Sequence, residues 1–254
     1  MTHDHRQLRL TTPVLHCITR SNNTIRHSSQ LVQNTNRRHV TMPDPNLVVS
    51  VLTPDEAPQW MRIRHAAFVD DMNKIFYSNA PASEKTLDRV VQEIRDNIKK
   101  GVMYTKCVDT STNEIVAGAR WTYHRPSDPN ATLRTPEEVD EELKVTEPYA
   151  EGHPEVWNAL FSLLYPNKRE IMGLRSYYSL DTLVTHPDHH RRGAGSLLLK
   201  EGLDKADELG VEAYLEASLM GRPLYERWGY EPIKDIALDL RRWGGEDVIE
   251  WTVS

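Results

Sequence analysis

The stretch V-T-H-P-D-H-H-R-R-G-A-G-S, residues 184–196, decides the fold. A run of strand-forming residues, 177–185, leads into it, and an apolar-periodic helix over 194–209 leads out of it. The first amides of such a helix have no intrahelical acceptor and carry the positive end of the macrodipole. Gly193 and Gly195 let a phosphate approach that backbone closely. The stretch therefore predicts an anion cradle that fixes a phosphorylated cofactor beside the strand.

Other glycine-rich phosphate loops do not fit these residues. A dinucleotide-binding fingerprint needs Gly-x-Gly-x-x-Gly early in a βαβ unit, and a P-loop needs Gly-Lys-Ser/Thr. The third glycine and the lysine are both missing, and the loop lies late in the chain. The bland alternative is an ordinary strand-to-helix turn with its arginines in solvent. A lone Gly-x-Gly would favour that alternative, but the residues downstream weigh against it.

A family resemblance rests on the loop itself. Residues 190–195, H-R-R-G-A-G, resemble the pyrophosphate loop of the GNAT acyl-CoA N-acyltransferases, whose pattern is Gln/Arg-x-x-Gly-x-Gly/Ala. The preceding Val-Thr-His-Pro is similar to the end of that family's central strand. His190 departs from the pattern, because Gln or Arg is usual there and histidine is a shorter donor. The resemblance implies that the backbone of this loop holds a pyrophosphate.

A second segment, 217–230, strengthens the resemblance. It follows a strand candidate over 212–217, and residues 222–228 are typical of a short helix that Gly229 ends. This arrangement resembles the family's closing motif, in which a helix carries a tyrosine toward the cofactor sulfur. Tyr225 matches that tyrosine, 29 residues after Ser196. A core aromatic on a helix face is the alternative interpretation of Tyr225.

The resemblance implies acetyl-CoA as the co-substrate. A backbone N–H near Leu183 or Val184 would meet the carbonyl oxygen, where negative charge develops. Thr185 would continue the contacts to the pantetheine arm in a strand-like manner. Ser218 stands where many members of the family carry an asparagine that contacts the cofactor. The implied cofactor-binding residues are Leu183, Val184, Thr185, His190, Arg191, Arg192, Gly193, Ala194, Gly195, Ser196, Ser218 and Tyr225.

Acyl transfer to an amine sets the requirements for the catalytic residues. An alkylamine is mostly protonated near neutral pH, so a group must accept its proton before attack. Tyr225 is our candidate general acid for the departing thiolate. For the base we favour Asp181, which alternates in phase with Leu183 along the strand, with Glu216 as the competitor. A structural carboxylate is the alternative for each, and a water chain could replace both.

These observations predict an acetyl-CoA-dependent N-acetyltransferase that acts on a primary amine by direct attack in a ternary complex. Two alternatives stay open: an acyltransferase that uses another acyl-CoA, and a catalytically idle acyl-CoA-binding or interaction module. The acceptor is either a small molecule or a peptide, and the sequence carries no motif that names it or the oligomeric state.

A metal site at the same loop is weighed and set aside. His186, His189 and His190 lie beside Asp188, and three imidazoles can bind zinc. All of them fall in one short turn, where a tetrahedral array is hard to close. We therefore predict no metal.

Composition limits the class of protein. The 254 residues suffice for one main domain, and no apolar run approaches the roughly 20 residues of a membrane span. Cys17 and Cys107 are the only cysteines, so the sequence provides no disulfide framework and favours a reducing, cytoplasmic compartment.

The N-terminal segment differs in charge from the rest. Residues 1–41 hold six arginines and one acid, whereas the whole chain has a net charge of −6. We interpret residues 1–45 as a disordered N-terminal extension. Alternatively, Met42 is the true start and the residues before it are not part of the protein. Its Arg-rich, acid-poor character also fits a mitochondrial transit peptide. Scattered arginines without aromatics argue against a nucleic-acid-binding arm.

The remaining elements predict an α/β (α+β) fold with a mixed central sheet flanked by helices, over residues 46–254. Residues 47–52 predict a strand, and Thr53-Pro54-Asp55-Glu56 is a helix start with an N-cap, Pro and a capping-box acid. The next elements are a helix over 81–100 and a hairpin over 102–123, and a late pair, 236–240 and 248–253, would finish the sheet.

Residues 125–173 form an insertion relative to the minimal fold implied by the resemblance. They carry an acidic run that begins at Pro136 and a helix candidate over 155–165. One interpretation is a solvated acidic helix plus a packing helix. The other is a lid beside the acceptor site that attracts a cationic amine.

Overall fold

The computed structural model describes residues 42–254, and the predictions for the N-terminal extension lie outside them up to residue 41. The strands are β1 (Leu47–Val51), β2 (Met103–Asp109), β3 (Glu114–His124), β4 (Tyr177–Thr185), β5 (Glu212–Tyr214), β6 (Glu216–Ser218), β7 (Lys234–Asp239) and β8 (Val248–Val253). The α-helices are α1 (Ala57–Ala67), α2 (Met72–Phe76), α3 (Glu84–Lys99), α4 (Pro136–Glu142), α5 (Pro154–Met172), α6 (Ala194–Leu209) and α7 (Arg222–Arg227).

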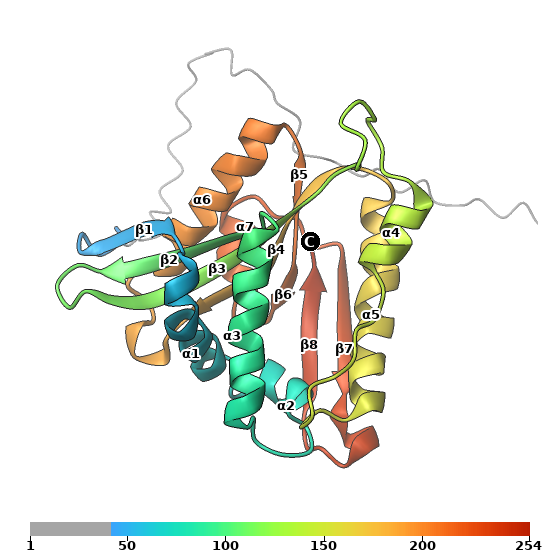
Figure 1. Cartoon of the computed structure of the whole chain (residues 1–254), viewed down its shortest axis with the longest axis horizontal. Coiled ribbons are helices and arrows are strands. Elements are labelled where there is room, and N and C mark those ends of the chain that lie inside the picture. Colours follow the sequence, from blue (N-terminus) through green and yellow to red (C-terminus); the bar gives the residue numbers. More distant parts are fainter. Residues whose placement is uncertain (1–41) are drawn as a thin grey trace, which may run out of the picture. The chain divides into compact units, whose positions relative to one another are not determined.

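A five-stranded sheet in the order β1-β2-β3-β4-β5 organises the domain (Figure 1). Its neighbours are antiparallel except β4 and β5, which run parallel. The predicted mixed central sheet flanked by helices is confirmed. Within residues 42–254, no helix is long and apolar enough to cross a membrane.

Local sequence signals set the ends of several helices. The Glu56 carboxylate accepts the backbone N–H of Thr53 at 2.9 Å, and a 3₁₀ turn over Pro54–Glu56 then leads into α1. Ser83 caps α3, because its hydroxyl accepts the N–H of Thr86 at 3.3 Å. The helix α5 extends past the predicted end at residue 165, and Pro166 lies inside it.

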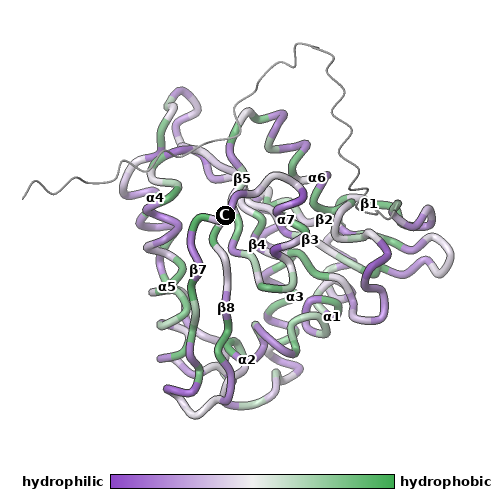
Figure 2. Tube along the Cα trace, turned by 180° about the vertical axis from the view of Figure 1, so that it is seen from behind, coloured by the Kyte–Doolittle hydropathy of each residue, from purple (hydrophilic) through white to green (hydrophobic). Residues whose placement is uncertain are grey.

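Helices cover both faces of the five-stranded sheet. On one face α6 packs through Leu198, Leu199 and Leu203, which are buried against β2, β3 and β4. On the other face α1 and α3 pack with Tyr104 of β2. In Figure 2, hydrophobic and hydrophilic residues alternate along α5 and α6, as expected for helices with one buried face.

The C-terminal strands correct one prediction. The strand expected over 212–217 is broken at Leu215, whose N–H and C=O both bond to Ser254 at 3.0 Å. The segment after the break, β6, joins β8 and β7 in a separate three-stranded sheet of order β6-β8-β7. The late pair therefore does not finish the central sheet; it builds a second one that α5 covers.

The break between the sheets opens one edge of β4. Parallel pairing of β4 with β5 covers only Tyr177 to Ser179, so within residues 42–254 no strand pairs with the edge from Leu180 to Thr185. On its other edge β4 stays paired with β3, with a register shift that leaves Asp181 as an extra residue. A β-bulge changes the direction in which a side chain points. This bulge lies at the open edge of β4.

Close contact between α6 and β3 depends on Gly202. A Cβ at this position would lie 2.0 Å from Cε2 of Trp121, a fully buried ring that stacks on Tyr178 with centroids 5.3 Å apart. We expect Gly202→Ala to destabilise the domain. Overpacking costs about 1–3 kcal/mol and outweighs the gain of roughly 1 kcal/mol in helix propensity.

Urea unfolding would measure this difference, with Glu201→Ala on the exposed face of α6 as the control. The control should change the unfolding free energy by no more than about 0.5 kcal/mol. Equal or greater stability of Gly202→Ala would contradict the tight contact between helix and sheet.

Candidate active site

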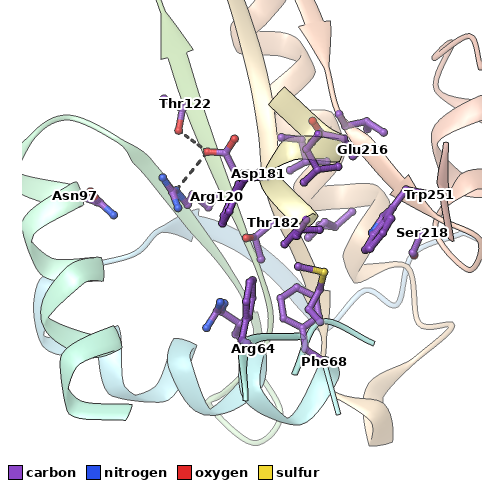
Figure 3. Close-up of a pocket in the computed structure, with 18 of the residues that line it drawn as sticks. Arg64, Phe68, Asn97, Arg120, Thr122, Asp181, Thr182, Glu216, Ser218 and Trp251 are labelled. Atoms are coloured by element: carbon purple, nitrogen blue, oxygen red, sulfur yellow. Dashed lines mark hydrogen bonds and ion pairs between the residues drawn. The ribbon is translucent and has the colours of Figure 1, made fainter. Parts of the chain in front are cut away.

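A cavity of about 540 Å³ lies at the open edge of β4. Its walls come from α1, α3, α5, β3, β4 and the second sheet, and Figure 3 shows the side chains that line it. Five residues predicted from the sequence line this cavity together, namely Asp181, Leu183, Glu216, Ser218 and Tyr225. The predicted phosphate loop, 190–196, is absent from its lining.

Asp181 is held by β3 and by its own strand. Its Oδ1 accepts the Ser179 hydroxyl at 2.7 Å, and its Oδ2 accepts the Thr122 hydroxyl. The Arg120 Nε lies 3.3 Å from Oδ2 (Figure 3). Because of the bulge, the strict alternation with Leu183 that the sequence suggested is interrupted, yet both residues line the cavity.

The charge of Asp181 is stabilised although its side chain is only 21% exposed. Burial alone would raise the pKa of this carboxyl. The positive charges of Arg120 and Lys168 and the two hydroxyl donors outweigh that effect and hold the pKa of Asp181 below its ordinary value. Asp181 is therefore an anion that attracts a cation strongly but retains a proton poorly.

Glu216 lies across the opening, on β6. Its Oε1 accepts the hydroxyl of Tyr214 at 2.8 Å, and Tyr214 is 1% exposed. Burial, followed by the charge of Glu216, raises the pKa of Tyr214, so that hydroxyl remains a donor. Glu216 has a structural partner, but it also lines the cavity.

Tyr225 projects into the cavity from α7. Its ring packs edge to face on Tyr230, with centroids 5.9 Å apart, and a Cβ at Gly221 would lie 2.7 Å from Cε2 of the ring. The Ser218 hydroxyl accepts the N–H of Gly221 at 3.2 Å, which fixes the turn before α7. Burial raises the pKa of Tyr225, so the hydroxyl stays protonated and can donate.

The predicted cradle has the backbone geometry of an anion site. Arg191 and Gly193 adopt positive φ of 62° and 97°, and the first intrahelical bond of α6 runs from the Leu197 N–H to Gly193 C=O at 3.1 Å. The amides of Ala194, Gly195 and Ser196 precede that bond. A Cβ at Gly193 would lie 2.8 Å from Cα of Pro43, so the loop and the segment before β1 fit closely.

Two side chains of the loop do not point to an anion as expected. Arg192 donates to Asp44 at 2.7 Å and to Asp109 at 2.6 Å, so its guanidinium joins the loop to the segment before β1 and to the end of β2. The His190 Nε2 lies 3.1 Å from the Thr185 carbonyl, which directs that nitrogen toward the backbone. The exposed Arg191 is the loop cation placed to meet solvent.

Backbone pairing distinguishes the two predicted oxyanion donors. The His186 N–H donates to Val116 of β3 at 2.9 Å. Since alternate amides of an antiparallel strand face the same neighbour, the Val184 N–H also faces β3. The amides of Leu183 and Thr185 face the open edge instead.

The histidine turn offers no metal arrangement. The His186 Nδ1 accepts the Asp188 N–H at 3.4 Å, and the His189 Nδ1 lies 2.9 Å from Arg192. Within the described part of the chain, no group of three or more His, Cys, Asp or Glu side chains is arranged to hold a metal ion.

Several residues of the cavity were missed from the sequence. Arg120, Thr122 and His124 of β3 line it, as does Glu142 of α4. The period-two spacing of three polar residues on a strand that is otherwise apolar is a signal that could have found the first three. Glu142, Leu160 and Lys168 come from the predicted insertion, so that segment forms part of the cavity wall.

Comparisons with known proteins agree with this architecture. The Acetyltransferase (GNAT) family matches residues 137–230. A 67-residue segment is 33% identical to the uncharacterized N-acetyltransferase YafP of Escherichia coli (strain K12), and it spans 26% of this chain and 42% of YafP, less than half of that relative.

Solved structures share the fold. A mosquito arylalkylamine N-acetyltransferase like 5b superposes with a TM-score of 0.56 at 20% identity, over 82% of this chain and 99% of the other. A Drosophila melanogaster polyamine N-acetyltransferase superposes with a TM-score of 0.56 at 18% identity, over the same shares of the two chains. The match over residues 137–230 is to the same family that the loop and the closing motif resemble.

The Arg192 cluster predicts a specific pH dependence of stability. Hydrogen bonds from Ser111 and Arg192 lower the pKa of Asp109 to about 2. A pKa lower in the folded than in the unfolded state stabilises the fold above the unfolded value of about 3.9, and that stability is lost as the pH falls toward 2. We expect Arg192→Gln to make the loss of stability below pH 4 shallower.

Urea midpoints measured between pH 5 and 3 would detect the change. The neighbouring, exposed Arg191→Gln is the matched control and should keep the slope of the unmodified protein. Identical slopes for both variants would show that the lowered pKa of Asp109 does not depend on Arg192.

Proposed function

We propose that this chain is an acetyl-CoA-dependent N-acetyltransferase that transfers the acetyl group to a primary amine by direct attack in a ternary complex. The observation that carries the proposal is the opening of β4, whose free edge leads from the amides of residues 194–196 to a cavity lined by Asp181, Glu216 and Tyr225. We therefore expect the pyrophosphate to lie at the loop, the pantetheine arm along the strand edge and the reacting groups in the cavity.

The loop and strand suit the two ends of the co-substrate. Helix-terminal amides and the charge of Arg191 would hold the pyrophosphate, and Gly195 leaves the space that a side chain would fill beside Leu224, 3.4 Å away. Acetyl-CoA supplies an activated thioester when it is bound. The Leu183 N–H, which faces the open edge, is the donor we assign to the carbonyl oxygen of the transition state.

The side chains of the cavity would then handle the protons. Asp181 attracts the ammonium form of the acceptor and takes its proton, since a neutral amine is needed for attack. Tyr225, kept protonated by burial, donates to the departing sulfur. Glu216 lies on the opposite wall, where it adds negative charge beside the acceptor.

The acceptor class that fits best is a small cationic amine. The cavity is lined by five carboxylates, on Asp71, Glu93, Glu142, Asp181 and Glu216, and by three permanent cations, on Arg64, Arg120 and Lys168. An acidic balance of this kind draws in a positive substrate. The solved relatives named for polyamine and arylalkylamine acetylation support this choice of acceptor.

Binding of acetyl-CoA tests the proposal directly. We expect calorimetric titration with acetyl-CoA to give a dissociation constant on the order of micromolar. Gly195→Val should weaken it at least tenfold, because the side chain would occupy the approach to the amides of α6. Ser196→Ala keeps that approach open and is the control. No binding by the unmodified protein would refute the acyltransferase proposal.

The role of Tyr225 is tested by Tyr225→Phe. We expect kcat with a polyamine acceptor to fall by about a hundredfold, the low end of general acid catalysis, while the dissociation constant for acetyl-CoA stays within twofold. Tyr123→Phe, on β3 and outside the cavity lining, is the matched control. Equal rates for the two variants would remove Tyr225 from the mechanism.

A further inference from the structure

A chain of hydrogen bonds leads away from Asp181 along the cavity wall. The Ser179 hydroxyl donates to Asp181 Oδ1 at 2.7 Å, and His124 Nε2 lies 2.8 Å from that hydroxyl oxygen. On the other side of the ring, His124 Nδ1 lies 2.9 Å from Glu142 Oε2. Four groups from β4, β3 and α4 are thus joined in series.

The chain is built into the fold rather than lying on the surface. Ser179 is 1% exposed, and the side chain of His124 is 11% exposed. The imidazole stacks on Tyr177, with centroids 4.3 Å apart and planes 16° from parallel. The Tyr177 hydroxyl donates to Glu142 Oε1 at 2.7 Å, and Arg134 donates to Oε2. The orientation of the ring is therefore fixed on each side.

The hydrogen bonds that link Asp181, Ser179, His124 and Glu142 allow two positions for the Ser179 hydroxyl hydrogen. A carboxylate only accepts, so Nδ1 of His124 carries a hydrogen that it donates to Glu142. Ser179 has one hydroxyl hydrogen. When the imidazole is neutral, this hydrogen is donated either to Asp181 or to His124 Nε2. When the ring is an imidazolium, its Nε2–H donates to Ser179, and the hydroxyl donates to Asp181. The hydroxyl can reverse between its two neighbours.

Glu142 is the counter-ion of His124 and not the group that finally holds the proton. Burial would raise the pKa of Glu142, but the His124 contact and the Tyr177 hydroxyl lower it to about 2. Asp181 likewise has a lowered pKa. Neither carboxylate is suited to keep a proton, whereas an imidazole ring has two nitrogens and can carry a hydrogen on each of them.

We propose that Ser179 and His124 form a relay that takes the acceptor's proton from Asp181, an inference that rests on the proposed function. The ammonium N–H bond breaks and its proton passes to an oxygen of Asp181. Asp181 returns a proton to the Ser179 oxygen while the Ser179 hydroxyl proton moves to His124 Nε2. Asp181 ends as a carboxylate, Ser179 as a hydroxyl and His124 as an imidazolium that is paired with Glu142.

Charged and titratable groups from each neighbouring element face this relay. Glu142 comes from α4 and Arg134 precedes it, while Lys168 and Tyr165 come from α5. Tyr177 and Asp181 come from β4. Glu142 contacts the imidazole directly, and Asp181 is linked to it through the Ser179 hydroxyl.

Two matched variants separate the relay from simple support of Asp181. Ser179→Ala and Thr122→Val each remove one hydroxyl donor from Asp181, but only the first breaks the path to His124. We expect kcat of Ser179→Ala to lie at least tenfold below that of Thr122→Val with the same amine. Equal values of kcat for the two variants would overturn the relay.

Chemical rescue provides a readout that a structural role would not move. His124→Ala opens space in a wall of the cavity, so added imidazole can occupy it. Imidazole should restore kcat at least tenfold in His124→Ala and should not restore it in the double variant with Ser179→Ala. A His124→Ala protein that binds acetyl-CoA but does not respond to imidazole would refute the relay. If His124→Ala fails to fold, the comparison of Ser179→Ala with Thr122→Val decides.

Nitrogen-15 NMR of the unliganded protein keeps the failure of the relay distinct from failure of the proposed function. The Nε2 resonance of His124 should shift in Ser179→Ala and remain near its position in Thr122→Val. An unmoved resonance in Ser179→Ala overturns the relay whether or not the enzyme is active. Conversely, the resonance could shift in a protein that acetylates no amine. That result would overturn both the proposed function and a catalytic role for the hydrogen bonds that link Asp181, Ser179 and His124.

Discussion

The separation of β4 from β5 after Ser179 is the constraint on which the rest of the domain depends. A strand edge with free amides needs partners, and burial without them would cost free energy for each group. The domain meets this requirement by leaving the edge open to a cavity and by turning the chain at Leu215 into a second sheet. One break in pairing therefore creates both the cavity and its far wall.

Charge placement within the cavity follows from the same opening. Strand β3 is still paired with β4 and contributes Arg120, Thr122 and His124 at period two, all toward the open side. The bulge at Asp181 lets its carboxylate meet donors from both strands. The cost of bringing a carboxylate into this wall is offset by one guanidinium and two hydroxyls, so the site holds a fixed anion without closing its access.

Local signals predicted local structure well. The strand over 177–185 and the helix over 194–209 have the bounds that the sequence indicated, because hydrophobic period and terminal glycines act within a few residues. Contacts between distant residues were not predictable in this way. Arg192 meets Asp44 and Asp109, which lie 148 and 83 residues away, and the break at Leu215 depends on Ser254. The alignment of His124 with Glu142 likewise requires α4 to be in place.

The folded domain begins before its first strand. Pro43 contacts Gly193, and Asp44 forms an ion pair with Arg192. A boundary at residue 46, drawn from the onset of strand pattern alone, would sever both contacts. Pro43 and Asp44, just before β1, therefore support the loop over 190–196, which is about 150 residues away in the sequence. Any recombinant fragment trimmed to its regular secondary structure would keep the sheet and lose the contacts that Pro43 and Asp44 make with the loop before α6.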